Sequence, residues 1–133
     1  MKIYIAYKFK DADTTILKKK LTELSNALES AGHSTFIFFR DVQKWGAVQT
    51  SLPEVIEGAT AGLKDCDMIL ADITEKANGV YFEMGYAKAL GLRVVAMCEA
   101  GKESAFLKAA ADEVVEYKDW ADLIRKIRIL NIE

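Results

Sequence analysis

Residues 65–96 read DCDMILADITEKANGVYFEMGYAKALGLRVVA, and this stretch decides the fold. It holds an apolar run at 67–72, a polar loop with the turn pair Asn78-Gly79, a helical segment at 79–90 and a second apolar run at 93–98. A strand, a helix and a strand in this order form a right-handed crossover between parallel strands. Because the centres of both strands, MILA at 68–71 and VVAM at 94–97, are continuously apolar, we expect helices on both faces of their sheet.

The same alternation extends in both directions along the chain. We expect strands at 2–7, 33–39 and 113–117, helices at 13–31, 52–63, 103–111 and 120–130, and a loop at 40–49. Alternating strands and helices predict an α/β fold, here a three-layer flavodoxin-like sandwich whose five-stranded parallel sheet has the order 2-1-3-4-5. We expect residues 1–133 to form a single α/β domain.

The composition narrows the classes of function. Hydrophobic residues make up 51% of the 133 residues and the formal net charge is -2, so we expect a soluble protein without a surface for nucleic acid or membranes. No apolar run approaches the ~20 residues that span a bilayer and no signal peptide is evident, which predicts a cytoplasmic protein. Cys66 and Cys98 lie in apolar runs and are interpreted as reduced core residues. With His33 as the single histidine and no Cys/His cluster, we expect no metal site. The sequence also offers no ligand set for an organic cofactor, so we expect no cofactor.

The predicted sheet order also predicts where a ligand binds. In open α/β sheets, ligands bind beyond the carboxyl ends of the strands where the strand order reverses, here between the first and third strands. Segments 7–13 and 74–79 follow those strands, and Glu83 lies about one turn into the next helix. The helix dipole favours an ionised carboxylate there, and the small Gly79 and Gly85 leave room for a ligand. We interpret Glu83 as a nucleophile or an acceptor for a ribose hydroxyl, the alternative being a solvated residue on the outer helix face.

Residues 65–96 resemble the nucleoside 2-deoxyribosyltransferase family, which includes the 2′-deoxynucleoside 5′-phosphate N-hydrolases. The motif EMGYA at 83–87, followed by Gly91, carries the resemblance, and KIYIA at 2–6 is similar to the first strand of the family. The resemblance implies cleavage or transfer at the N-glycosidic bond of a nucleoside or nucleotide. It also implies a homodimer or higher homo-oligomer, with sites completed across subunit contacts.

The resemblance assigns a role to each matching residue. Glu83 would attack C1′ of the sugar, and Tyr4 would orient this nucleophile. Lys8 and Lys10 would contact a 5′-phosphate, and Ser104 would reach that phosphate across a dimer interface. The other residues expected to bind the substrate are Ala6, Tyr7, Asp72, Asn78, Gly79 and Tyr81.

Several of these residues also have ordinary structural interpretations. Tyr4 fits a core position in a strand, Lys8 and Lys10 fit a solvated loop, and Asp72 fits a turn cap. The aromatic residues at 38–39 and Trp45 either wall the pocket or anchor a loop.

The sequence departs from the family pattern at four places. Ala59 stands where the helix before the third strand has a catalytic aspartate, and the nearest acids are Glu54 and Glu57. Tyr81 replaces a glycine, Ala77 replaces a polar residue, and Tyr7-Lys8 replaces a glycine-serine pair. Tyr81 is expected to narrow the sugar pocket or to stack on a ligand.

Three interpretations of the function remain open. The first is an N-glycosidic hydrolase or transferase, for which the lysines favour a phosphorylated substrate. The second is a TIR-like NAD glycohydrolase, since KIYIAYKFKD at 2–11 is similar to the first strand and loop of TIR domains. The third is a non-catalytic module that senses nucleotides or binds a protein partner.

Overall fold

The computed structural model describes residues 1–102 and 104–132. The strands are β1 (Lys2–Ala6), β2 (Ser34–Phe36), β3 (Met68–Asp72), β4 (Arg93–Glu99) and β5 (Glu113–Tyr117). The helices are α1 (Thr14–Ser30), α2 (Phe38–Asp41), α3 (Leu52–Lys64), α4 (Asn78–Ala89), α5 (Ala105–Ala110) and α6 (Trp120–Arg128), and a 3₁₀ turn, η1 (Lys44–Gly46), precedes α3. All paired strands are parallel and follow the order β2-β1-β3-β4-β5, which confirms the predicted flavodoxin-like topology.

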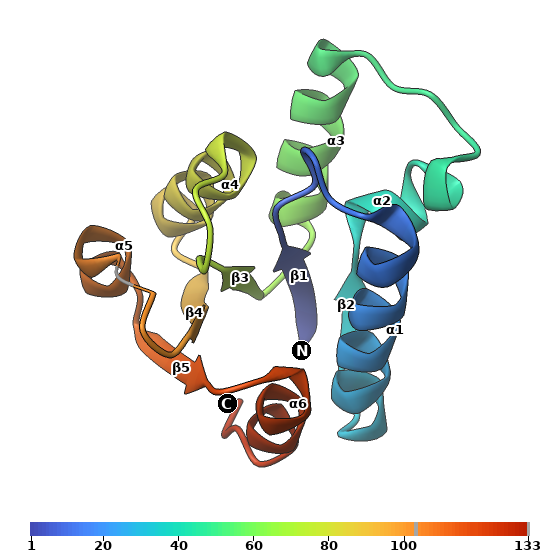
Figure 1. The fold of residues 1–133 in the computed structure, drawn as a ribbon. Helices are drawn as coiled ribbons and strands as arrows, with labels where there is room; N and C mark the ends of the chain where they lie inside the picture. Colours follow the sequence, from blue (N-terminus) through green and yellow to red (C-terminus); the bar gives the residue numbers. More distant parts are fainter. Residues whose placement is uncertain (103, 133) are drawn as a thin grey trace.

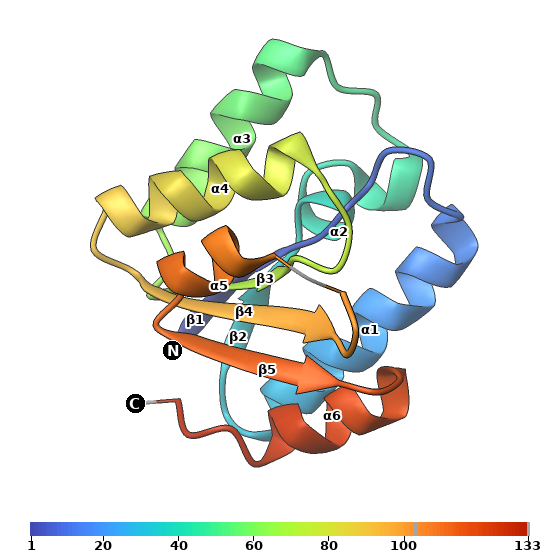
Figure 2. The same ribbon diagram turned by 60° about the vertical axis from the view of Figure 1, so that its left-hand side comes forward.

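Helices cover both faces of the sheet, as Figures 1 and 2 show. Helices α1 and α6 lie on one face, and α3, α4 and α5 lie on the other. Side chains alternate between these faces along β1, so that Ile3 and Ile5 pack with α1 and α6, whereas Tyr4 and Ala6 pack with α3 and α4. The alternation places the hydroxyl of Tyr4 on the same side of the sheet as α4.

The second strand differs from the sequence-based expectation. Residues 33–39 were expected to form a strand, but β2 ends at Phe36 and α2 begins at Phe38. The backbone N–H of Ile37 donates a hydrogen bond to the Asp41 carboxylate (2.9 Å), which stabilises a helical turn in a stretch whose apolar pattern alone favours an extended chain. The expected loop at 40–49 therefore contains the end of α2 and the turn η1. The other predicted elements are present, with ends that differ by at most two residues, and Glu103 lies outside the described residues.

Two glycines let α3 approach aromatic side chains near β2. A Cβ atom on Gly62 would lie 2.7 Å from the ring of Phe36, and one on Gly58 would lie 2.6 Å from the ring of Phe38. Because ordinary Cβ contacts are longer, larger residues at these positions would displace the rings. The glycines thus set the position of α3 and of Phe38 on its side of the sheet.

The structure also bears on the two cysteines and on membrane spans. Cys66 and Cys98 are buried and do not form a disulfide, in agreement with their prediction as reduced core residues. No helix within the described part of the chain has the length and apolar character needed to cross a bilayer.

Candidate functional site

A cleft of about 590 Å³ lies beyond the carboxyl ends of β1 and β3. It is lined by the segment 7–11 after β1, one face of α3, the loop 76–79 and the first turns of α4. Phe38 and Gln43 complete the wall. The cleft lies at the point of strand-order reversal where the sequence predicts a ligand.

Glu83 lines this cleft from the second turn of α4 and is hydrogen-bonded to Tyr4 of the central sheet. The buried Tyr4 of β1 donates a hydrogen bond from its hydroxyl to the Glu83 carboxylate, and the Tyr4 ring is stacked on Phe36 with centroids 5.2 Å apart. Burial raises the pKa of Glu83 to about 7, and the hydrogen bond from Tyr4 opposes this rise because it favours the ionised form. The carboxylate is therefore held in one place and titrates near neutral pH.

Tyr7 connects the end of β1 to the wall of the cleft. Its hydroxyl oxygen accepts a hydrogen bond from the backbone N–H of Phe39 (2.7 Å), and burial raises its pKa above the ordinary value. Tyr7 therefore remains protonated and fixes α2 beside the cleft.

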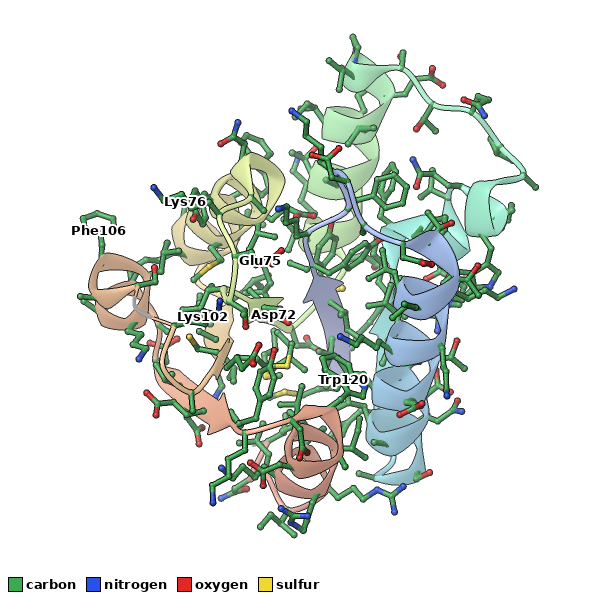
Figure 3. All side chains as sticks on the ribbon, in the orientation of Figure 1. Asp72, Glu75, Lys76, Lys102, Phe106 and Trp120 are labelled. Carbon is green, nitrogen blue, oxygen red and sulfur yellow. The ribbon has the colours of Figure 1, made fainter. Side chains whose placement is uncertain are left out.

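Lysines gather at the cleft from two loops. Lys8, Lys10 and Lys76 line it together with Asp11, and the Lys8 ammonium lies 3.4 Å from the carboxylate of Glu75. Lys76 and Glu75 follow β3 on the loop that leads into α4 (Figure 3). This arrangement offers positive charge to an anionic group of a ligand.

The beginning of α4 also suits an anion. The residue before its first turn, Ala77, provides no side-chain cap for the free backbone N–H groups. Asn78 and Gly79 of this turn line the cleft, and a Cβ atom on Gly79 would meet nothing within 4 Å. A phosphate can thus approach the helix start closely beside the lysines.

The α3 side of the cleft is apolar. Its lining residues follow a helical spacing and are Leu52, Val55, Ile56 and Ala59. Glu54 and Glu57, the acids nearest to Ala59 in the sequence, are exposed and do not line the cleft. Glu54 instead accepts a hydrogen bond from the backbone N–H of Ser51 (3.0 Å) in the capping box that begins α3. Neither acid takes the place of the aspartate that the family pattern has at Ala59.

Asp72 lies away from Glu83, in a second cavity of about 260 Å³ on the α1 and α6 side of the sheet. Ala6 also borders this cavity, although its side chain packs with Tyr4 on the α3 and α4 side. The Asp72 carboxylate accepts hydrogen bonds from the backbone N–H of Thr74 (3.0 Å) and the hydroxyl of Tyr117 (3.1 Å). The hydrogen bond to Thr74 is the turn cap that the sequence allows. Tyr7 and Lys8 line both this cavity and the cleft of Glu83.

Tyr81 and Ser104 lie in a third place, a largely apolar groove between α4 and α5. Phe106, which is 87% exposed, borders the same groove (Figure 3). Two positions along a helix correspond to a rotation of about 200°, so Tyr81 points away from the side of α4 that carries Glu83. Tyr81 thus borders this groove and not the cleft of Glu83, and its expected contact with the sugar or another part of a ligand stays a prediction. The role of Ser104 across a dimer interface stays a prediction.

The structure also decides which aromatic residues wall the cleft. Phe38 lines it, whereas Phe39 and Trp45 pack edge to face with centroids 5.2 Å apart and anchor the chain after β2. Phe9, Asp11 and Lys76 also line the cleft, although no sequence motif marks them individually. Their position in the sequence indicates this location, because all three lie on the post-strand segments expected to bind a ligand.

Within 1–102 and 104–132, no three His, Cys, Asp or Glu side chains are placed to hold one ion.

Known proteins share the fold of this chain. Solved structures with the same fold include the CMP N-glycosidase BcmB of Clostridium botulinum (17% identity, TM-score 0.72, 96% of this chain and 97% of that chain). They also include BlsM (23% identity, TM-score 0.75, 96% of this chain and 86% of that chain). A third is a 2-deoxyribosyltransferase of Bacillus psychrosaccharolyticus (19% identity, TM-score 0.65, 99% of this chain and 93% of that chain). A search of curated protein sequences finds no significant match.

The sequence profile described as nucleoside 2-deoxyribosyltransferase matches residues 3–120. This range includes Tyr4, Glu83 and the complete lining of the cleft. The match supports an enzyme of the glycosyl transferase or N-glycosidase type. The chain belongs to the nucleoside 2-deoxyribosyltransferase family.

Proposed function

We propose that the protein cleaves or transfers at the N-glycosidic bond of a nucleoside 5′-monophosphate, with Glu83 as the nucleophile. The observation that carries the proposal is the Glu83 carboxylate, which lines the cleft and accepts a hydrogen bond from the buried Tyr4. A carboxylate held in this way can attack C1′ and form a glycosyl ester while the base departs. Water or a second base then displaces the sugar from Glu83, which gives hydrolysis or transfer.

The lysines support a phosphorylated substrate. Lys8, Lys10 and Lys76 and the uncapped start of α4 border the same cleft as Glu83. A 5′-phosphate bound there would hold the sugar near the carboxylate through charge-assisted hydrogen bonds. Replacing Lys8 or Lys10 by alanine should raise KM for nucleoside monophosphates and leave KM for unphosphorylated nucleosides nearly unchanged.

We also propose that the protein forms a homodimer or higher homo-oligomer. The groove between α4 and α5, with Phe106 exposed at its edge, supports this because apolar surface of this kind is usually covered by a partner. Sedimentation velocity measures the assembly, and Phe106→Ser should shift it towards the monomer.

The proposed reaction is tested by base release. The protein is incubated with ribonucleoside and deoxyribonucleoside monophosphates, with deoxynucleosides plus a free base, and with NAD, and products are separated by chromatography. We expect base release to be lost in Glu83→Ala and to persist in Glu57→Ala. Glu57 is the control because it is an exposed glutamate outside the cleft. Undiminished release from Glu83→Ala would refute the nucleophile. If no substrate yields base but a nucleotide raises the melting temperature, the protein is a non-catalytic sensor.

A further inference from the structure

The cleft contains few groups able to protonate a departing base. Among the described residues, its carboxyl groups are those of Glu83 and Asp11, and α3 contributes apolar side chains alone. Asp11 is exposed to solvent on the loop after β1. Glu83 is assigned to the attack on C1′. No buried carboxylic acid of the described cleft is thus left for the base.

The tyrosines are no better suited to this task. Tyr7 lines the cleft, but its hydroxyl oxygen accepts the hydrogen bond from Phe39, and burial raises its pKa, which makes it a weaker acid than ordinary tyrosine. The hydroxyl of Tyr4 donates to Glu83, and Tyr4 itself does not line the cleft. Neither side chain combines a position beside the base with a readily donated proton.

This shortage matters because the charge of the base decides whether an acid is needed. When the bond from C1′ to a neutral base breaks, the electron pair leaves the ring nitrogen negative unless a general acid supplies a proton. When the attached base is already cationic, the same electron pair neutralises the ring, and the base leaves as a neutral molecule.

We infer that the cleft is built for nucleoside monophosphates whose base carries a positive charge, such as a ring-N-alkylated purine or a pyridinium. The inference rests on the proposed attack by Glu83. A carboxylate oxygen of Glu83 forms a bond to C1′, the bond from C1′ to the ring nitrogen breaks, and its electron pair stays with the nitrogen. Water then attacks C1′, the ester bond breaks with its electron pair returning to Glu83, and the water proton passes to solvent.

The lining of the cleft fits such a substrate. Phe9, Phe38 and Phe82 border it, and faces of aromatic rings attract delocalised cations. The Glu83 carboxylate supplies the opposite charge within the same cleft, whereas the lysines come from the loops at 8–10 and 76. A ligand with both an anionic phosphate and a cationic base would find groups of opposite charge for each within this cleft.

Matched substrates test the inference. Guanosine and deoxyguanosine 5′-monophosphates are compared with their 7-methyl derivatives, and nicotinamide mononucleotide with its neutral reduced form, after subtraction of spontaneous base release. Because a general acid contributes about 10²–10⁴-fold to such reactions, we expect kcat/KM to favour each cationic substrate by at least about 100-fold.

A gain-of-function variant provides the second arm. Ala59→Asp places a carboxyl group on the cleft side of α3 and should raise kcat/KM for the neutral substrates at least about tenfold, with a smaller effect on the cationic ones. Ala61→Asp makes the same change at an exposed position of α3 outside the cleft and should alter neither. If Ala59→Asp does not fold, as judged by its melting curve, Ile56→Asp introduces the acid at a more exposed lining position.

The outcomes separate this inference from the proposed function. Equal kcat/KM values for neutral and cationic partners, both abolished by Glu83→Ala, would overturn the charge selectivity and leave the nucleophile in place. A strong preference for cationic bases together with a response to Ala59→Asp confirms the inference. Absence of base release from every substrate would overturn both.

Discussion

The hydroxyl of Tyr4 donates a hydrogen bond to the carboxylate of Glu83, although 79 positions separate the two residues in the sequence. Tyr4 is fully buried in an interior strand, and α4 brings Glu83 over the same face of the sheet. Two opposed effects meet at this contact. Burial favours the neutral acid, and the tyrosine hydroxyl favours the carboxylate that attacks C1′.

Tyr4→Phe should move the pH dependence of base release. Removal of the hydroxyl deletes the hydrogen bond that lowers the pKa of Glu83, so this pKa should rise from about 7. The ionised fraction at neutral pH then falls, and a rise of about one pKa unit gives roughly a fivefold loss of activity at pH 7. Initial rates between pH 5 and 9 should show the rising limb displaced to higher pH.

Tyr117→Phe is the matched control for that change. Tyr117 is also buried, but its hydroxyl contacts Asp72 and Thr74 in the second cavity. Its removal should leave the pH midpoint of base release unchanged. An equal displacement in both variants would show that loss of a buried hydroxyl, and not the bond to Glu83, causes the effect.

Glu83→Gln should stabilise the folded protein at alkaline pH. The folded-state pKa of Glu83 is raised to about 7 from an ordinary value of 4.5, so the unfolded chain ionises first as the pH rises. The contribution of the neutral acid to stability is full below pH 4.5 and is lost as the pH rises through 7. At pH 8 the variant should exceed the parent by about 1–3 kcal/mol in the free energy of unfolding. Urea denaturation at pH 4.5 and 8 checks this, and a difference that is the same at both values would contradict the raised pKa.

Gly79→Ala should weaken binding of the phosphate without weakening the fold. The new methyl group would contact no protein atom within 4 Å but would project at the start of α4, where the cleft opens. KM for a nucleoside monophosphate should rise roughly tenfold, a loss of ~1.4 kcal/mol. Gly85→Ala, at an equally open position on the same helix but outside that cleft, should leave KM unchanged. Equal KM values for the two variants would argue against a phosphate at the helix start.

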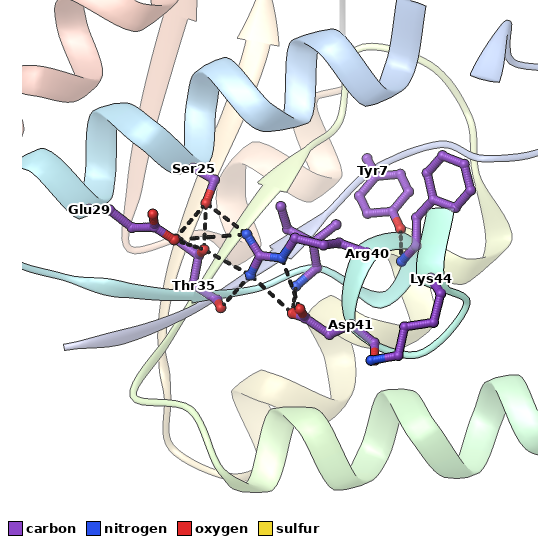
Figure 4. Close-up of polar contacts among 9 residues, drawn as sticks. Tyr7, Ser25, Glu29, Thr35, Arg40, Asp41 and Lys44 are labelled. Carbon is purple, nitrogen blue, oxygen red and sulfur yellow. Dashed lines mark hydrogen bonds and ion pairs between the residues drawn. The ribbon is translucent and has the colours of Figure 1, made fainter. Parts of the chain in front are cut away.

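Arg40→Lys should destabilise the segment that carries Phe38. The Arg40 guanidinium donates to the hydroxyl of Ser25 (2.9 Å), the carbonyl oxygen of Thr35 (2.8 Å) and the carboxylate of Asp41 (2.8 Å), joining α1, β2 and α2 (Figure 4). An ammonium group cannot make these planar, divergent contacts, so the free energy of unfolding should fall by about 1–3 kcal/mol.

Arg125→Lys controls for the loss of a guanidinium as such. The Arg125 side chain is 69% exposed on α6, so the same substitution there should change stability by less than about 0.5 kcal/mol. Chemical denaturation of both variants gives the comparison. A similar cost at both positions would mean that the network around Arg40 contributes little.

The sheet order could be predicted because it depends on a pattern repeated over the whole chain. Apolar strands that alternate with amphipathic helices leave few topologies, and a reversal between the first and third strands follows. Helix α2 could not be predicted in the same way. Its turn depends on the Asp41 carboxylate at the N–H of Ile37 and on Arg40 contacts to distant elements, which a local apolar pattern does not encode.

The candidate site was predicted more accurately by segment than by side chain. The loops after β1 and β3 do border the cleft, but Asp72 and Tyr81 face elsewhere. Met68 and Leu70 pack towards α1 and α6, so the period of two along β3 carries Asp72 to that side as well. The period of the helix likewise separates Tyr81 from Glu83. The periods of strand and helix, applied residue by residue, predict which candidates face the cleft of Glu83 and which face elsewhere. The burial of Glu83 cannot be predicted in this way, because it depends on how distant elements pack together.

The sequence separation of Tyr4 and Glu83 also determines when a nascent chain acquires its site. Strand β1 is synthesised first but pairs with β2 and β3 on its two edges, so both edges stay open until those strands follow. At 5–20 residues per second, roughly 4–16 s pass between synthesis of the two site residues. Recovery of base release after dilution from denaturant would therefore report the docking of α4 onto β1, a late and non-local step of folding.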